Sequence, residues 1–177
     1  MKEIIKILNK MIKDKIIDDF VLGGATALLY YADNIFQTED IDIFISVKHT
    51  GLIFNLEPIY TYLKYNYNDI GKYGEYIIVK DFPLQFLLPG DSLHKEAIKN
   101  FKTITIQGEK CKIFSFEYLI ALMIFLFKPK YRERIRLIIE GKTYDEKKLN
   151  DILKRHSLLD KFNKIKDKFN EENILWS

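Results

Sequence analysis

The stretch from Phe20 to Phe44 constrains the fold of this chain more than any other segment. A short apolar run over residues 20–22 ends in Gly23-Gly24, and an apolar, helix-like stretch follows over residues 25–32. Asp40 and Asp42 then alternate with isoleucines at the start of an apolar run that extends to residue 47. This order predicts a strand, a glycine turn, a helix and a second strand.

The same stretch carries a possible binding chemistry. Two glycines allow backbone N–H groups to approach a phosphate at the N-terminus of a helix. Two aspartates spaced by two on a strand point to one face, where they can share a Mg²⁺ ion. Each feature alone also has a purely structural interpretation: the glycines can form an ordinary turn, and the aspartates can lie on a solvated strand face. Together, with 15 residues between Gly24 and Asp40, they predict a site that can hold a nucleotide.

Length and charge bound the remaining possibilities. A chain of 177 residues makes one domain, or one domain with a helical appendage. Residues 1–127 carry 14 Lys and Arg against 16 Asp and Glu, whereas residues 128–177 carry 14 against 9. A mildly basic tail can assist an anionic ligand, but it is not the strong basic footprint of a nucleic-acid-binding protein.

Other features limit the cellular compartment that we expect and the kinds of metal site that the chain can form. Cys111 is the only cysteine, which excludes an internal disulfide and a cysteine-based zinc site. The N-terminus has the pattern of an amphipathic helix, not of a signal peptide. The most apolar run, residues 114–127, is shorter than the roughly 20 residues that a membrane span needs. We therefore expect a cytoplasmic protein that makes no contact with a membrane.

Hydrophobic periodicity predicts an α/β half followed by a helical half, with a boundary between residues 114 and 115. Pro58 is a candidate break in the helix predicted over 52–64, and Ser115 is a candidate cap for the helix that starts at 116. Helices are predicted over 2–15, 25–32, 52–64, 93–99, 116–127, 131–140, 145–155 and 158–170. Strands are predicted over 20–22, 41–47, 76–79, 84–88, 103–107 and 110–114, the last four as two hairpins.

With these residues in view, the chain resembles the nucleotidyltransferase superfamily that has a DNA-polymerase-β-like catalytic fold. Residues 38–43 read Thr-Glu-Asp-Ile-Asp-Ile and are similar to the Thr-x-Asp-Ile-Asp form of that family. The resemblance sharpens toward the small prokaryotic group related to abortive-infection and type IV toxin–antitoxin nucleotidyltransferases. It does so through residues 83–89, which read Pro-Leu-Gln-Phe-Leu-Leu-Pro, and through residues 117–121 and 152–158 of the tail.

The resemblance implies a mixed β-sheet of the nucleotidyltransferase fold with a helical C-terminal extension. It implies that Gly23 and Gly24 face a triphosphate and that Asp40 and Asp42 hold Mg²⁺ or Mn²⁺ as the catalytic carboxylates. Thr26, on the first turn of the helix, joins the expected nucleotide-binding residues.

One position departs from the family pattern. Active members carry a third carboxylate on a later strand, and the aligned residue here is Gln85. A neutral amide cannot serve as a base. Glu75 and Asp81 are possible substitutes, although both also read as ordinary surface acids.

Beyond that motif, the basic residues between 128 and 136 are candidate phosphate ligands. Lys130 and Arg134 share a helical face and are the two that we expect at the nucleotide. A solvated helix face is the alternative reading of this cluster. The family often has an aspartate where this chain has Tyr131. The histidines at 49, 94 and 156 have no partner that the sequence identifies.

The leading expectation is a Mg²⁺-dependent enzyme that moves a nucleoside monophosphate from an NTP to a hydroxyl of a protein, an RNA or a small molecule. The alternative is a catalytically silent nucleotide-binding or protein-interaction module, which Gln85 favours. A third possibility is a toxin–antitoxin component that acts with a cognate antitoxin.

Overall fold

A computed structural model describes residues 1–31, 40–46 and 55–175 of the chain. Its helices are α1 (Lys2–Lys13), α2 (Gly24–Tyr31), α3 (Glu57–Asn66), α4 (Ser92–Lys99), α5 (Phe116–Leu126), α6 (Pro129–Gly141), α7 (Glu146–Arg155) and α8 (Leu159–Leu175). Its strands are β1 (Asp19–Leu22), β2 (Ile41–Ser46), β3 (Ile70–Tyr73), β4 (Tyr76–Val79), β5 (Phe82–Leu87), β6 (Phe101–Ile106) and β7 (Glu109–Phe114).

The strands form one seven-stranded mixed sheet in the order β3-β4-β5-β2-β1-β7-β6. Strand β2 lies at its centre, antiparallel to β1 and parallel to β5. The β4–β5 hairpin lies on one side of β2, and the β6–β7 hairpin lies on the other side, beyond β1. The mixed α/β class predicted from the sequence is confirmed.

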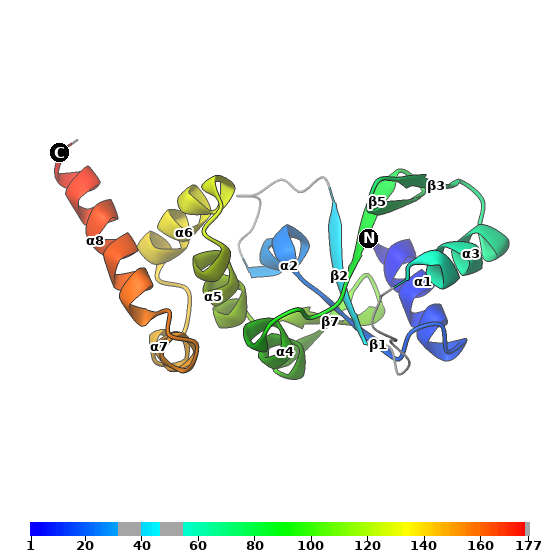
Figure 1. Ribbon diagram of the computed structural model, residues 1–177, viewed down its shortest axis with the longest axis horizontal. Coiled ribbons are helices and arrows are strands. Elements are labelled where there is room, and N and C mark those ends of the chain that lie inside the picture. The colour runs from blue at the N-terminus through cyan, green and yellow to red at the C-terminus, as the bar shows by residue number, and fades with distance from the viewer. Residues whose placement is uncertain (32–39, 47–54, 176–177) are drawn as a thin grey trace.

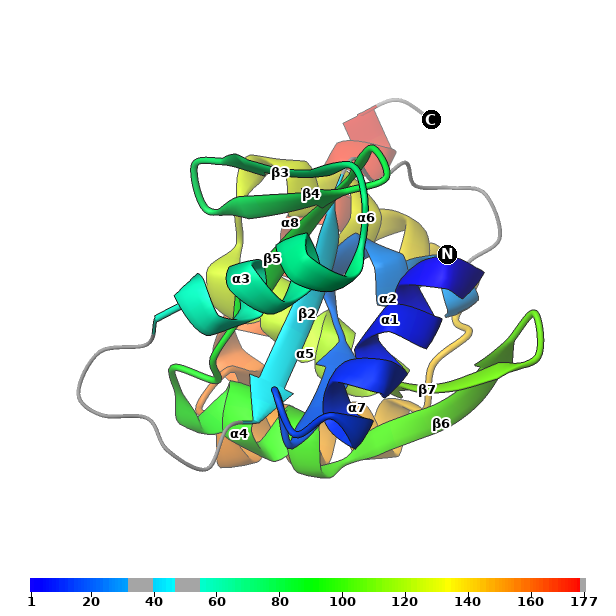
Figure 2. The ribbon, with the colours of Figure 1, turned by 90° about the vertical axis from the view of Figure 1, so that its right-hand side faces the viewer.

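Helices cover both faces of the sheet. Helices α1 and α3 lie on one face, and α2 and α5 lie on the other, with α6 and α8 beyond α5 (Figure 1 and, from the side of α1 and α3, Figure 2). Amphipathic α1 buries its apolar stripe, Ile4, Ile5, Ile7, Leu8 and Met11, because these side chains recur at helical spacing. The core is continuous from this stripe through the sheet to α5.

Helix α5 joins the helical half of the chain to the sheet. Every residue from Phe116 to Ile124 is buried, and the helix contacts α2, α4, α6 and α7. It ends at Leu126, with Phe127 as its C-cap, and Pro129 opens α6. The boundary between residues 114 and 115 stays a prediction. Within the part of the chain that the structure describes, no helix combines the length and apolar character needed to cross a bilayer.

Several local predictions need correction. Strand β3 was missed, and β5 begins at Phe82, so Lys80 and Asp81 alone make the β4–β5 turn, both with positive φ. Ser115 occupies the cap position of α5, but its side chain makes no capping hydrogen bond. Pro58 lies in the first turn of α3, so it helps to start the helix and does not break it. The ends of three predicted elements, at Ala32, Val47 and residues 52–54, lie outside the described residues.

Candidate functional site

The turn after β1 can be built only from glycines. The Gly23 N–H donates to the carbonyl oxygen of Asp42 at 2.9 Å, which brings the turn against β2. A Cβ on Gly23 would lie 2.6 Å from Cε2 of Phe44. Gly24 has φ +52°, and a Cβ there would lie 1.7 Å from Oδ2 of Asp42. The first residue of α2 therefore touches a carboxylate of the neighbouring strand, and no larger residue fits between them.

Asp40 and Asp42 lie beside this turn, one just before β2 and the other within it. Ile41 and Ile43 are buried on the opposite face, as the period of two requires. The Thr26 hydroxyl donates to the backbone carbonyl of Asp40 at 3.3 Å, which ties the first turn of α2 to the start of β2. The Tyr76 hydroxyl donates to Oδ2 of Asp40 at 3.5 Å.

The electrostatics of the pair suit a cation. Burial, together with the neighbouring charge of Asp40, raises the pKa of Asp42 to about 6, against the opposing effect of Lys130 and Lys128. Two close carboxylates that repel one another in a partly buried site gain stability from a bound divalent ion, and oxygen ligands are those that Mg²⁺ and Mn²⁺ prefer. The residues present therefore fit one such ion held by Asp40 and Asp42.

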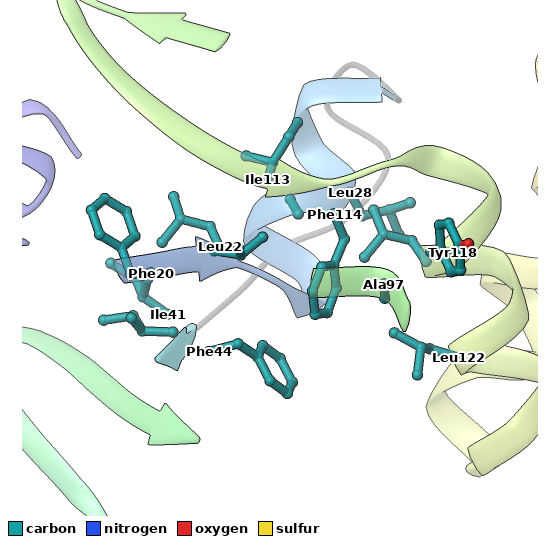
Figure 3. Packing of buried hydrophobic residues seen from close by; sticks show 14 of the residues in the cluster. Phe20, Leu22, Leu28, Ile41, Phe44, Ala97, Ile113, Phe114, Tyr118 and Leu122 are labelled. Carbon is teal, nitrogen blue, oxygen red and sulfur yellow. The ribbon is translucent and has the colours of Figure 1, made fainter. Parts of the chain in front are cut away.

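A cleft of about 320 Å³ opens over this pair. One part of its lining is polar: Asp40, Asp42, Glu75, Tyr76, Gln85, Lys128, Lys130, Tyr131 and Arg134. The rest is mostly apolar: Gly24, Leu28, Phe44, Leu87, His94, Phe114, Leu119, Leu122, Met123 and Leu126. Figure 3 shows three residues of the apolar part, Phe44 of β2, Phe114 of β7 and Leu122 of α5, converging from different elements. The cleft thus joins a charged compartment to an apolar one.

Gln85 lines the same cleft as the aspartate pair. It is the register partner of Asp42 across the parallel β2–β5 pair and of Tyr76 across the β4–β5 pair, so all three side chains share a face. Of the two candidate substitutes, Glu75 lines the cleft from the β3–β4 turn, whereas Asp81 is exposed at the other end of β4 and is not part of the lining. Within residues 1–31, 40–46 and 55–175, no group of three or more His, Cys, Asp or Glu could hold a metal.

The basic residues in α6 and at its N-cap lie in three different environments. Lys128, Lys130 and Arg134 line the cleft, and the pKa of Asp42 responds to the first two. Arg132 lines a separate groove against α8. Arg136 pairs with Glu140 at 3.4 Å. The helical spacing of Lys130 and Arg134 therefore brings both to the cleft.

Two of the expected nucleotide-binding residues donate hydrogen bonds to the backbone carbonyls of the aspartate pair. Gly23 and Thr26 are not among the lining residues, and their hydrogen bonds fix Asp42 and Asp40. These hydrogen bonds hold the backbone from which the two carboxylates extend.

Sequence reasoning found no partner for His94, but the structure supplies one. Nδ1 of His94 lies 2.7 Å from Oδ2 of Asp91, the capping residue of α4, and the ring stacks on Phe44. An aspartate at a helix N-cap with a histidine three positions later is the only sequence signal for this contact. Arg155 and His156 serve elsewhere, because both bind the carboxylate of Glu96. His49 lies outside the described residues.

Comparison with known proteins relates the fold of this chain to a solved structure. No protein-family model matches the chain. The search of curated proteins also returns no match. Among solved structures, the chain is similar to the crystal structure of an antigenic nucleotidyltransferase-like protein from Paracoccidioides brasiliensis, with a TM-score of 0.53 and 19% identity. The match covers 71% of this chain and 65% of that one, so it spans slightly less than two thirds of the neighbour's length. The chain therefore has a nucleotidyltransferase-like fold.

Proposed function

We propose that this protein is a nucleotidyltransferase that moves a nucleoside monophosphate from an NTP to a hydroxyl acceptor with the help of Mg²⁺ or Mn²⁺. The observation that carries the proposal is the contact between Gly24, at the start of α2, and the carboxylate of Asp42. It sets a helix N-terminus, which favours phosphate, beside a carboxylate pair, which favours a divalent cation.

Each part of the charged compartment has a role in this proposal. Asp40 and Asp42 hold the cation, which when bound neutralises phosphate charge and polarises the phosphorus that reacts. The N–H groups at the start of α2 and the side chains of Lys130 and Arg134 bind the phosphates. The acceptor hydroxyl then attacks the α-phosphorus, and pyrophosphate leaves.

A transfer assay with matched variants tests the proposal. The protein is incubated with Mg²⁺ and each of the four NTPs labelled on the α-phosphate, with RNA, small alcohols and the protein itself as acceptors. We expect label to enter one acceptor, and γ-labelled NTP to transfer nothing. Asp42→Asn removes one cation ligand and abolishes transfer. Asp81→Asn makes the same chemical change at the exposed β4–β5 turn, where asparagine tolerates the positive φ, and keeps wild-type transfer.

A second candidate function rests on Gln85. The register with Asp42 puts a neutral amide beside the carboxylate pair, which leaves less negative charge for a second metal. This favours a protein that binds MgNTP without transferring it. Saturable NTP binding that needs Asp42, with no transfer to any acceptor, would support this candidate over the enzyme.

The finer role in a toxin–antitoxin pair is also a proposal, and it rests on the resemblance of residues 83–89, 117–121 and 152–158. It expects a neighbouring gene whose product relieves growth arrest when both are expressed together. The same experiment with Asp42→Asn should show no arrest to relieve. Arrest by the variant as strong as that by wild type would contradict the proposal.

A further inference from the structure

His94 is anchored in a way that leaves one ring nitrogen available. Oδ1 of Asp91 accepts from the backbone N–H of His94 at 2.9 Å, and Oδ2 lies 2.7 Å from Nδ1 of the ring. An ionised carboxylate only accepts hydrogen bonds, so Nδ1 carries the proton and Nε2 of the neutral ring carries the lone pair. Partial burial raises the pKa of Asp91, but hydrogen bonds from the backbone and ring of His94 outweigh burial. The pKa is therefore lowered, and the carboxylate stays ionised.

The ring faces the cleft that holds the carboxylate pair. His94 and Phe44 both line that cleft, and their ring centroids are 5.2 Å apart. Phe44 is two residues beyond Asp42 on β2, a distance of about 7 Å along a strand. The side chain of His94 is only 15% exposed. Among the residues that the structure describes, no hydrogen-bond partner reaches Nε2, and that atom is not sealed from solvent.

Among the residues that the structure describes, few other groups that line the cleft can take a proton. Asp40 and Asp42 are committed to the cation in the proposed function, and Gln85 is an amide. Burial raises the pKa of Tyr131, so it is a phenol and not a base. Glu75 remains, but it is exposed on the β3–β4 turn at the rim. His94 lines the cleft, and the orientation of its ring is fixed by Asp91.

We propose that His94, oriented by Asp91, is the general base that takes the proton of the acceptor hydroxyl in the transfer reaction. The inference rests on the proposed function. The hydroxyl O–H bond breaks with its proton passing to Nε2, while the oxygen bonds to the α-phosphorus of the NTP. The bond from that phosphorus to the oxygen bridging to the β-phosphorus breaks, and pyrophosphate leaves with the electron pair. A base of this kind contributes about 10²–10⁴-fold to a rate.

Kinetics of conservative variants test this role. His94→Gln keeps the backbone N–H that Asp91 caps, and it should lower kcat by about 100-fold or more while KM for the NTP stays within about threefold. Asp91→Asn keeps a capping oxygen but presents an N–H to Nδ1, which drives the ring proton to Nε2 and should also lower kcat. Imidazole added to His94→Ala should restore part of the rate. Wild-type kcat in His94→Gln, or loss of kcat in Glu75→Gln alone, would overturn the proposal.

Chemical labelling gives a readout that does not depend on turnover. Diethyl pyrocarbonate acylates unprotonated imidazole nitrogens, so His94 should be modified at Nε2 and protected by MgATP or another MgNTP that binds. His156 is the internal control, because Ser92 and Glu96 engage both of its ring nitrogens. A His94 that stays unlabelled, or that MgNTP fails to protect while wild type still transfers, would overturn the base role alone. If wild type neither binds nor transfers NTP, the proposed function and this inference fall together.

Discussion

The substitution Gly24→Ala probes the contact on which the site is built. Gly24 has φ +52°, a conformation that costs an L-residue about 1–2 kcal/mol. The added Cβ would also lie 1.7 Å from Oδ2 of Asp42, so either the turn or the carboxylate must move. Forcing a methyl group into a filled site costs about 1–3 kcal/mol. The total, about 2–5 kcal/mol, is a large part of the 5–15 kcal/mol that holds a typical domain folded.

Gly74 provides the matched control. It has φ +58°, and a Cβ there would meet nothing within 4 Å. Gly74→Ala should therefore cost only the conformational term of about 1–2 kcal/mol. Urea denaturation of both variants and the wild type measures the difference, which we expect to be about 1–3 kcal/mol. In thermal unfolding that difference corresponds to roughly 2–12 °C for a chain of this size.

The same variant links stability to binding. Because the clash displaces the carboxylate of Asp42, folded Gly24→Ala should also lose most of the affinity for MgNTP. Equal destabilisation of Gly24→Ala and Gly74→Ala, with MgNTP binding intact, would refute the claim that the turn and the carboxylate are in contact.

Three further perturbations have defined outcomes. Without divalent cations, the pKa of Asp42 at about 6 means that the folded state keeps this proton to higher pH than the unfolded chain. The free energy of unfolding should fall by up to about 3 kcal/mol between about pH 3 and pH 7. Asp42→Asn should remove that fall and be more stable than wild type at pH 7, as urea titrations at several pH values will show. Gln85→Asp adds a carboxylate beside Asp42 and should tighten Mn²⁺ binding, measured by calorimetry, and raise the rate of transfer; an unchanged or abolished rate would mean that Glu75 or another group supplies the missing role. Burial raises the pKa of Glu96, but hydrogen bonds from the surrounding donors outweigh burial and lower this pKa to about 2. The stability that the ionised carboxylate contributes is therefore present above pH 4.5 and is lost as the pH falls toward 2. Glu96→Gln should therefore cost about 1–3 kcal/mol at pH 7 and less at pH 3, measured by urea titration at both values.

Local patterns in the sequence were enough to predict that the glycine turn and the aspartate pair lie together at the centre of the candidate site. The period of two put Asp40 and Asp42 on one face, and the glycine pair signalled a tight turn before a helix. Both features depend on neighbouring residues, so a single sequence contains them. Helical spacing likewise brought Lys130 and Arg134 to one side of α6.

Other features depend on contacts that no local pattern encodes. Strand β3 reads Ile-Gly-Lys-Tyr and lies at the edge of the sheet, half of it exposed, so it lacks the apolar alternation of a buried strand. The stacking of His94 on Phe44 joins residues 50 positions apart, so no local pattern around the histidine identifies this contact. The hydroxyl of Ser115, which makes no capping hydrogen bond, instead accepts from Lys148 of α7 at 3.4 Å, a contact 33 positions away in the sequence.

Calorimetric titration of MgNTP into wild type, Asp42→Asn and Asp81→Asn tests the central claim most directly. The account predicts saturable binding to wild type and Asp81→Asn, and at least about tenfold weaker binding to Asp42→Asn, a loss of about 1.4 kcal/mol. Equal binding by all three proteins, or binding by none, would contradict the claim that the carboxylate pair beside Gly24 holds a metal-bound nucleotide.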